Sequence, residues 1–231
     1  MKKTFTPLRM AVMAAALFPL TTFATNGYQL IGVGAYQKSL AGAVTANPGS
    51  AMTAVSNPAG LARIGTRADF SLEAFMPKRD VDFTAMGGVD AESASSMYGV
   101  PAIGWTAPVA DGREMYFGGG MFGTSGMGVD YATTSMMPGM NMYWEGYSNL
   151  SFWQLAPAHA WNVNGRFSIG VSLNLDYQAV SFKQLVSADT TGDGNADMVM
   201  QNFDLSRGAS GFGLGFGVGL LYDLNDRVTV G

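Results

Sequence analysis

The sequence predicts an all-β protein, a transmembrane antiparallel β-barrel with a small N-terminal helical hatch, and two alternating stretches carry the prediction. Between Phe167 and Gln178, apolar residues at every odd position alternate without exception with small or polar residues at every even position. Between Gly211 and Tyr222, glycines alternate with large apolar residues in the same way. Period two is the side-chain spacing of a strand. A run of this length exceeds most strands of soluble proteins and suits a tilted strand, which crosses a bilayer with about 9–11 residues. The apolar face would then meet lipid, and the polar or glycine face would line a wet lumen.

The composition agrees with a wall that faces lipid. Of 231 residues, 13% are charged and 31 are glycine, whereas an ordinary soluble domain has about 25% charged residues and about 7% glycine. The formal net charge is -4, so no basic surface favours nucleic acid as a partner. The chain contains no cysteine, and a barrel closed by its own hydrogen bonds needs no disulfide.

Residues 1–24 have the pattern of a secretory signal peptide. Lys2, Lys3 and Arg9 precede an apolar run from Met10 to Leu20, and small residues end the segment at Ala24. The alternative, an N-terminal membrane anchor, is disfavoured because the apolar run is shorter than the roughly 20 residues that span a bilayer. Export together with alternating strands predicts the bacterial outer membrane as the location.

Residues 25–64 show little alternation and are predicted to be a hatch, or plug, with short helices. Asn47-Pro48 and Asn57-Pro58 each look like a helix cap followed by proline at the first helical position. We expect helices at about 36–45 and 48–55, and then a turn through Asn57, Pro58, Ala59 and Gly60. A segment this small cannot bury a core of its own, so it should pack on the barrel or plug it.

Residues 65–231 are predicted to be the first half of a barrel. Strands are expected at 67–76, 98–109, 114–123, 147–161, 167–182, 211–223 and from 227 onward. Tight hairpins are indicated at Asp111-Gly112, Asn164-Gly165 and Asn225-Asp226, and long loops at 77–97, 124–146 and 183–210. Short turns at one rim and long loops at the other are typical of outer-membrane barrels. Because an open barrel edge in lipid would leave backbone groups unpaired, we expect the chain to be truncated.

Several motifs resemble one family. They are Thr25-Asn26-Gly27-Tyr28-Gln29-Leu30, Gly42-Ala43-Val44-Thr45-Ala46, Asn57-Pro58-Ala59-Gly60-Leu61, Ala107-Pro108-Val109, Phe167-Ser168-Ile169-Gly170 and Gly219-Leu220-Leu221-Tyr222-Asp223-Leu224. Together they resemble the FadL/TodX-like outer-membrane transporters of long-chain fatty acids and other hydrophobic molecules. The resemblance implies a 14-stranded barrel, about half of it present here, closed by an N-terminal hatch that contains Asn57 to Gly60.

The resemblance also implies an inward kink in the third strand, which opens a side gap for lateral exit of the ligand. The matching strand is 114–128, and its residues Gly123, Ser125, Gly126 and Gly128 are the kink candidates. Glycine tolerates unusual backbone angles and weakens a strand ladder. The alternative is that these glycines only relieve crowding inside the wall.

A methionine-rich segment is unusually apolar for a loop that faces water. It contains Met136, Met137, Met140, Met142, Tyr143 and Trp144. Flexible methionines can form an adaptable apolar groove, so we expect a first capture site for hydrophobic ligand here. The alternative is that the loop packs on itself.

Two polar sites are weaker candidates. Lys183 lies near the place where the family has a basic contact and could bind a ligand carboxylate, although strict alternation would point it outward with Tyr177. The segment from Asp189 to Asp197 resembles the start of a calcium loop, with Asp189, Asp193 and Asp197 as ligands, but Met200 replaces the usual bidentate glutamate.

Catalysis has little support in the sequence. The single histidine, His159, has no nucleophile or carboxylate near it in the chain. No enzyme activity and no cofactor are expected. The sequence therefore predicts a monomeric passive channel that is surrounded by outer-membrane lipid and carries hydrophobic small molecules. Long-chain fatty acids are the first expectation for the ligand, and aromatic hydrocarbons are the alternative ligand class. The alternative is a surface adhesin or a structural barrel.

Overall fold

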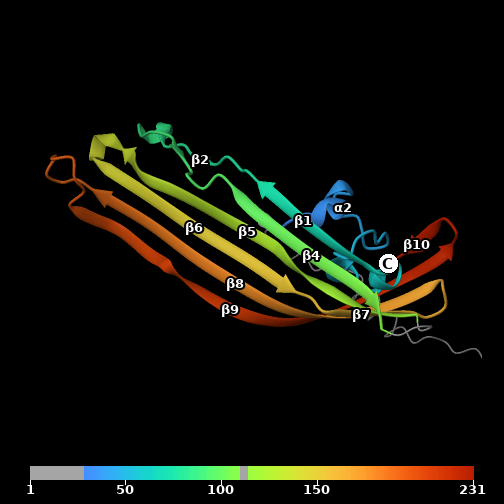
Figure 1. The fold of residues 1–231 in the computed structure, drawn as a ribbon. Helices are drawn as coiled ribbons and strands as arrows, with labels where there is room; N and C mark the ends of the chain where they lie inside the picture. The colour runs from blue at the N-terminus through green and yellow to red at the C-terminus, as the bar shows by residue number, and fades with distance from the viewer. Residues whose placement is uncertain (1–28, 110–113) are drawn as a thin grey trace, which may run out of the picture.

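A computed structural model describes residues 29–109 and 114–231, and most of its strands form one curved antiparallel sheet (Figure 1). The sheet order is β1-β4-β5-β6-β8-β9-β10, and β7 pairs with β5 and β8. The strands are β1 (Arg67–Phe75), β4 (Tyr98–Pro108), β5 (Met115–Met137), β6 (Met142–Leu155), β7 (Ala158–Asn162), β8 (Phe167–Ala188), β9 (Met198–Asn225) and β10 (Val228–Val230). A separate small sheet pairs β2 (Asp80–Val81) with β3 (Ala91–Glu92). The predicted all-β antiparallel fold is confirmed.

The strands are longer than the alternation indicated. Residues 124–146 and 183–210, predicted to be long loops, belong mostly to β5, β6, β8 and β9. The β8–β9 ladder runs from Phe167↔Tyr222 to Ala188↔Met198, with irregular pairing near Val180 and Val186. The prediction was wrong because backbone pairing continues where the outward side chains cease to be apolar. The connection at 77–97 is the one long loop of the three that the structure keeps, and it contains the 3₁₀ helix η2 (Thr84–Met86).

The predicted strand 147–161 is divided at Ala156-Pro157 into β6 and β7, since proline has no N–H for the ladder. The hairpin at Asn164-Gly165 is present, with Gly165 at φ 73° and the Asn164 side chain accepting hydrogen bonds from the N–H groups of Arg166 and Phe167. Asn225-Asp226 joins β9 to β10 as expected. The predicted signal peptide and the Asp111-Gly112 hairpin lie outside the described residues.

The N-terminal segment, residues 29–66, has less helix than predicted. It contains α2 (Gly34–Ser39), α3 (Thr53–Ser56) and the 3₁₀ helix η1 (Pro58–Ala62). Asn57 caps η1 as expected, because its side-chain oxygen accepts a hydrogen bond from the N–H of Ala59. The expected cap at Asn47-Pro48 is wrong, since no helix begins at Pro48 and α3 starts at Thr53.

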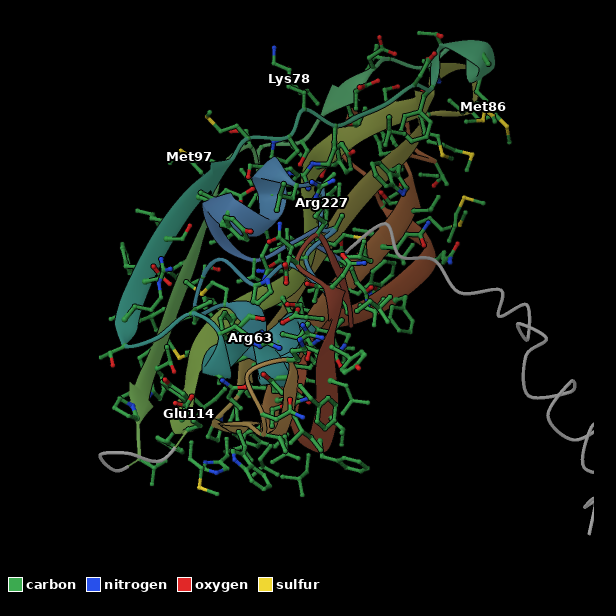
Figure 2. All side chains as sticks on the ribbon, turned by 90° about the vertical axis from the view of Figure 1, so that its right-hand side faces the viewer. Arg63, Lys78, Met86, Met97, Glu114 and Arg227 are labelled. Carbon is green, nitrogen blue, oxygen red and sulfur yellow. The ribbon has the colours of Figure 1, made fainter. Side chains whose placement is uncertain are left out.

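The curved sheet wraps around this segment, and Figure 2 shows Arg63 on the concave side. The core lies between the two: Met52, Ala54 and Leu61 of the N-terminal segment pack with Phe122 of β5 and with the small residues Ala158 and Ala160 of β7. The contact is close at Gly170, where an added Cβ would lie 2.4 Å from the nitrogen of Ala59. Because Gly170 and Ser168 face this segment, even-numbered residues of β8 point inward and odd-numbered residues point outward.

The outward face carries an apolar band bounded by two aromatic pairs. Phe167 packs on Tyr222 at 6.4 Å between ring centroids, and Tyr177 packs on Phe212 at 5.2 Å. From Phe167 to Tyr177 a strand rises about 33 Å, or about 23 Å along the membrane normal at a tilt of about 45°. This is close to the apolar height of an outer-membrane wall, about 25 Å. Within the described residues, no helix is both long and apolar enough to cross a membrane.

Candidate ligand pocket and wall opening

The sheet has an opening between β4 and β5. The two strands pair from Pro108↔Tyr116 to Ala102↔Phe122, and there the ladder ends. Beyond this point Tyr98 to Pro101 of β4 pair with β1, while β5 pairs with β6. The 77–97 connection rejoins β5 further along, where the N–H of Ala94 donates to the carbonyl oxygen of Asp130 at 2.8 Å. A window therefore interrupts the wall beside residues 123–129 of β5.

Local sequence explains where the window begins. Pro101 occupies the next position of β4 after the last pair, and proline cannot donate to a ladder. On β5, the pairing with β6 shifts register between Gly123 and Ser125, which leaves Thr124 as a bulge. Bulges bend the strand that carries them. The bulge lies inside the glycine-rich stretch for which we expected a kink; its use as an exit stays a prediction.

Two hydrogen bonds cross the window. The N–H of Leu30 donates to the carbonyl oxygen of Thr124 at 3.2 Å, and the hydroxyl of Tyr98 donates to the carbonyl oxygen of Gly128 at 3.0 Å. The first belongs to the N-terminal segment, so this segment partly covers the window from within. Movement of the segment would therefore change the size of the opening.

A cavity of about 550 Å³ lies at the window. Its walls are mainly apolar and come from the N-terminal segment, the two strands that separate and β6; they include Leu30, Ile31, Phe75, Val100, Met127, Leu150, Phe152 and Trp153. Gly123, Gly126 and Gly128 also line it. This size and lining are those of a site for one small hydrophobic molecule.

The charged residues in the lining are Lys38, Glu73 and Arg79. Lys38 of α2 forms an ion pair with Glu73 of β1, and each side chain is 29% exposed. This ion pair ties the outer part of the N-terminal segment to the wall. It stands at the cavity, so a charged ligand group there would compete with it.

Arg79 has no carboxylate partner among the described residues. Its guanidinium donates to the carbonyl oxygen of Ser95 and to the hydroxyl of Tyr98, and its Cζ lies 5.4 Å from the centre of the Tyr98 ring. The Nε atom is buried with no hydrogen-bond partner in the structure. Sequence reasoning missed this residue because the 77–97 connection gave no sign that it returns to the cavity.

The opposite end of the N-terminal segment is fixed to the rim of the sheet. The Asn57 side-chain amide donates to the carbonyl oxygens of Thr45 and Leu220, at 2.8 and 2.9 Å. Arg63 donates to the Ser168 hydroxyl and to the Asp223 carboxylate, both at 2.7 Å. Of the predicted hatch residues, Pro58, Ala59 and Gly60 are buried in this contact.

The methionine-rich segment is a tight hairpin, not a long loop. β5 ends at Met137, the 3₁₀ helix η3 spans Pro138–Met140, and β6 begins at Met142. Trp144 packs on Phe83 and Tyr131 with ring centroids 5.4 and 5.3 Å apart. This contact agrees with the self-packing alternative for Trp144. Met142 is buried, Met136, Met137 and Tyr143 are half-buried, and Met140 is 62% exposed.

The remaining candidates lie apart from the cavity. Lys183 is on the outward face, as strict alternation requires, and forms an ion pair with Glu145, so its geometry does not suit a ligand inside the barrel. His159 lies in β7 opposite Val171 and Phe117.

In the loop that resembles a calcium site, the carboxylates accept hydrogen bonds from N–H and hydroxyl groups of the same loop. The Asp189 carboxylate accepts hydrogen bonds from the N–H groups of Thr191, Gly192 and Gly194. The Asp197 carboxylate accepts from the N–H and hydroxyl of Thr190, and these bonds lower the pKa of Asp197 below its ordinary value. Within residues 29–109 and 114–231, no acidic or histidine side chains cluster as a metal site would require. Asp189, Asp193 and Asp197 do not gather into such a group in the structure, and calcium binding at this loop stays a prediction.

Comparison with solved structures supports the fold. The P. putida toluene transporter TodX matches with a TM-score of 0.62 and 17% identity, over 87% of this chain and 54% of that one. A Pseudomonas aeruginosa FadL homologue matches with a TM-score of 0.55 and 18% identity, over 88% of this chain and 51% of that one. The chain thus spans about half the length of these two proteins.

Comparison with curated protein sequences gave no significant match. The model of the family described as outer membrane protein transport protein (OMPP1/FadL/TodX) matches residues 12–231, which is nearly the whole chain. The family and the fold together locate the protein in the bacterial outer membrane. The chain belongs to the OMPP1/FadL/TodX family of outer-membrane transport proteins.

Proposed function

We propose that this protein is a passive outer-membrane channel whose principal ligands are long-chain fatty acids. The observation that carries the proposal is an apolar cavity of about 550 Å³ at an opening in the wall, with Arg79 in its lining. An alkyl chain would fill the apolar part, while the carboxylate would meet the Arg79 guanidinium. Charge-assisted hydrogen bonds of this kind are among the strongest in proteins. Aromatic hydrocarbons would fill the same cavity without using Arg79.

Entry of ligand from outside would follow the inward face of the long strands. Beyond Tyr177 the polarity of β8 reverses, so that Val180 and Phe182 point inward. Phe182 packs on Phe203 of β9 at 5.5 Å, and both rings remain partly exposed, at 39% and 53%. An exposed apolar surface of this kind would hold an alkyl chain before it reaches the cavity. The exposed Met140 at the hairpin tip would extend that surface.

The N-terminal segment would act as the hatch. Its outer part is held at the cavity by the Lys38–Glu73 ion pair and by the Leu30–Thr124 hydrogen bond. Its inner part is held by the contacts of Asn57 and Arg63 at the rim. We infer that the outer part moves and the inner part stays in place. Lateral exit into the membrane would then follow through the window beside residues 123–129.

A cavity-filling variant tests the proposal. An added Cβ at Gly126 would lie 3.5 Å from its nearest neighbour, the carbonyl oxygen of Leu150, so Gly126→Phe fits the backbone and fills the cavity. Uptake of labelled long-chain fatty acid by cells expressing the full-length gene should fall severalfold. Gly126→Ala is the matched control, because its Cβ makes the same ordinary contact with Leu150 but leaves the cavity open. Equal uptake in both variants would contradict the proposal that the cavity binds the fatty acid during transport.

A second variant separates the two ligand classes. Arg79→Leu should reduce uptake of fatty acid about tenfold, the size expected for loss of one charge-assisted contact, and leave uptake of a labelled aromatic hydrocarbon unchanged. A parallel loss for both compounds would assign Arg79 a structural role. If neither compound enters cells that carry correctly located wild-type protein, an adhesin or structural barrel becomes the better description.

A further inference from the structure

A second hollow lies on the outward face of the sheet, next to the cavity at the window, and shares Asn149 and Ser151 with the lining of that cavity. Its volume is about 250 Å³, and it is lined by β6, β8 and β9. The side chains that can donate a hydrogen bond there are Asn149, Ser151, Tyr177, Ser181, Arg207 and Ser210. We call it the outer pit.

The register places these side chains outside the barrel. Ser168 and Gly170 contact the N-terminal segment on the inside, so Tyr177 and Ser181 of the same strand point outward. β6 and β8 pair without a shift, and Ser151 and Asn149 lie opposite Ala179 and Ser181. Paired residues of an antiparallel ladder share a face, so these two side chains point outward as well.

The height of the pit corresponds to the lipid headgroups. Tyr177 lies in its wall, and the Tyr177–Phe212 pair marks one edge of the apolar band. The other edge, at Phe167 and Tyr222, adjoins the short turn at Asn164-Gly165. Because short turns of such barrels face the periplasm, the pit lies at the outer leaflet.

The pit has the chemistry of an anion site. Arg207 is the one charged residue in its lining, and no carboxylate lines it. Among the described residues, Arg207 forms no ion pair. The pairing of β8 and β9 is irregular where Ser181 and Arg207 lie, and Gly208 has a φ of 76°. This irregularity turns the strand so that Arg207 reaches the pit beside Ser181 and Ser210. A planar guanidinium surrounded by hydroxyl and amide donors suits a phosphate group.

We propose that the outer pit binds the phosphate of an outer-leaflet lipid headgroup, with Arg207 as the principal contact and the pit serines as supporting donors. Such a lipid would lay its acyl chains on the apolar band directly below. The contact would fix the height of the wall in the membrane. The proposal depends on the location in the outer membrane and is independent of which ligand the channel carries.

The test measures lipid that remains bound to the full-length protein. The protein is extracted from outer membranes in mild detergent, and bound lipid A, the phosphorylated glycolipid of the outer leaflet, is quantified by native mass spectrometry. Arg207→Gln should retain about tenfold less lipid A than wild type, since a charge-assisted contact is lost. Arg166→Gln is the matched control, because Arg166 is also exposed but adjoins the opposite aromatic pair at Phe167. Equal retention in the two variants would overturn the proposal.

A second measurement identifies the group that is bound. Wild-type protein in phosphatidylcholine discs should bind added lipid A and bind its dephosphorylated form about tenfold more weakly. Equal binding of the two forms would rule out phosphate recognition. Displacement of lipid A by inorganic phosphate alone would reduce the pit to a site for free anions and reject the lipid assignment. If Arg207→Gln fails to assemble, Ser181→Val provides the second pit variant, and it too should retain less lipid A than Arg166→Gln.

Discussion

The two ends of the N-terminal segment are attached to the sheet in different ways. Around Asn57 and Arg63 the contact is dense: backbone lies against backbone at Gly170, and side-chain hydrogen bonds reach β8 and β9. Around α2 the attachment includes one ion pair between half-exposed side chains, Lys38 and Glu73. Dense burial resists displacement, whereas an exposed ion pair contributes about 0–1 kcal/mol. This difference supports the proposal that the segment is fixed at the rim and movable at the cavity.

The largest effect is expected where the fixed end touches the sheet. In Gly170→Ala the new Cβ would lie 2.4 Å from backbone atoms of both Pro58 and Ala59, so the backbone itself must shift. We expect a loss of about 3 kcal/mol in the free energy of unfolding. Gly215→Ala is the matched control, because it also points inward, and its Cβ would lie 3.6 Å from Asn174, an ordinary contact. Denaturant unfolding of the full-length protein in micelles measures both; similar losses would mean that the close contact is not what holds this end.

Removal of the Arg63 side chain should have the next largest effect. Arg63→Met loses the hydrogen bonds to Ser168 and Asp223 and leaves the Asp223 carboxylate without its charged partner. The expected loss is about 2 kcal/mol, because charge-assisted bonds at half-buried sites are involved. Arg67→Met is the control: its ion pair with Asp69 is more exposed, at 38% for the arginine, and should contribute less than about 1 kcal/mol. An equal cost for the two variants would remove the distinction between a fixed rim contact and an ordinary surface pair.

The movable end should show the opposite balance of stability and activity. Lys38→Met removes one partner of the ion pair with Glu73 and should change the free energy of unfolding by less than about 1 kcal/mol. If the pair holds the hatch closed, uptake of labelled fatty acid should rise. Glu73→Gln should raise uptake in the same way, and the double variant should add nothing further. Unchanged uptake in all three would separate the ion pair from gating.

The sequence predicted the strands of the wall better than their connections. The alternation from Phe167 to Gln178 indicated both faces of β8, and Asn57-Pro58 indicated the cap of η1; the structure has both. The continuation of β8 after Phe182 and the part of β9 that precedes Gly211 were missed because the outward residues become polar there, although pairing continues. The window, Arg79 and the Lys38–Glu73 pair depend on contacts between segments far apart in the chain. No local period in the sequence encodes those contacts. Pro101 marks the start of the window only once the register between β4 and β5 is known.

The smallest effect concerns the dependence of the rim contact on pH. Asp223 lies just beyond Tyr222, outside the apolar band, and its pKa is lowered by the hydroxyl of Thr229 first and by Arg63 second. A carboxylate whose pKa is lower in the folded state stabilises that state above its ordinary pKa, and this stabilisation is lost as pH falls through the lowered value. Acid should therefore weaken the fixed end, and Asp223→Asn should unfold with a shallower acid dependence than wild type in the range below the ordinary aspartate pKa, about 3.9. Unfolding curves of the full-length protein at a series of acid pH values measure the difference. Identical slopes for the two proteins would show that the rim is held by packing at Gly170 and not by the Arg63–Asp223 pair.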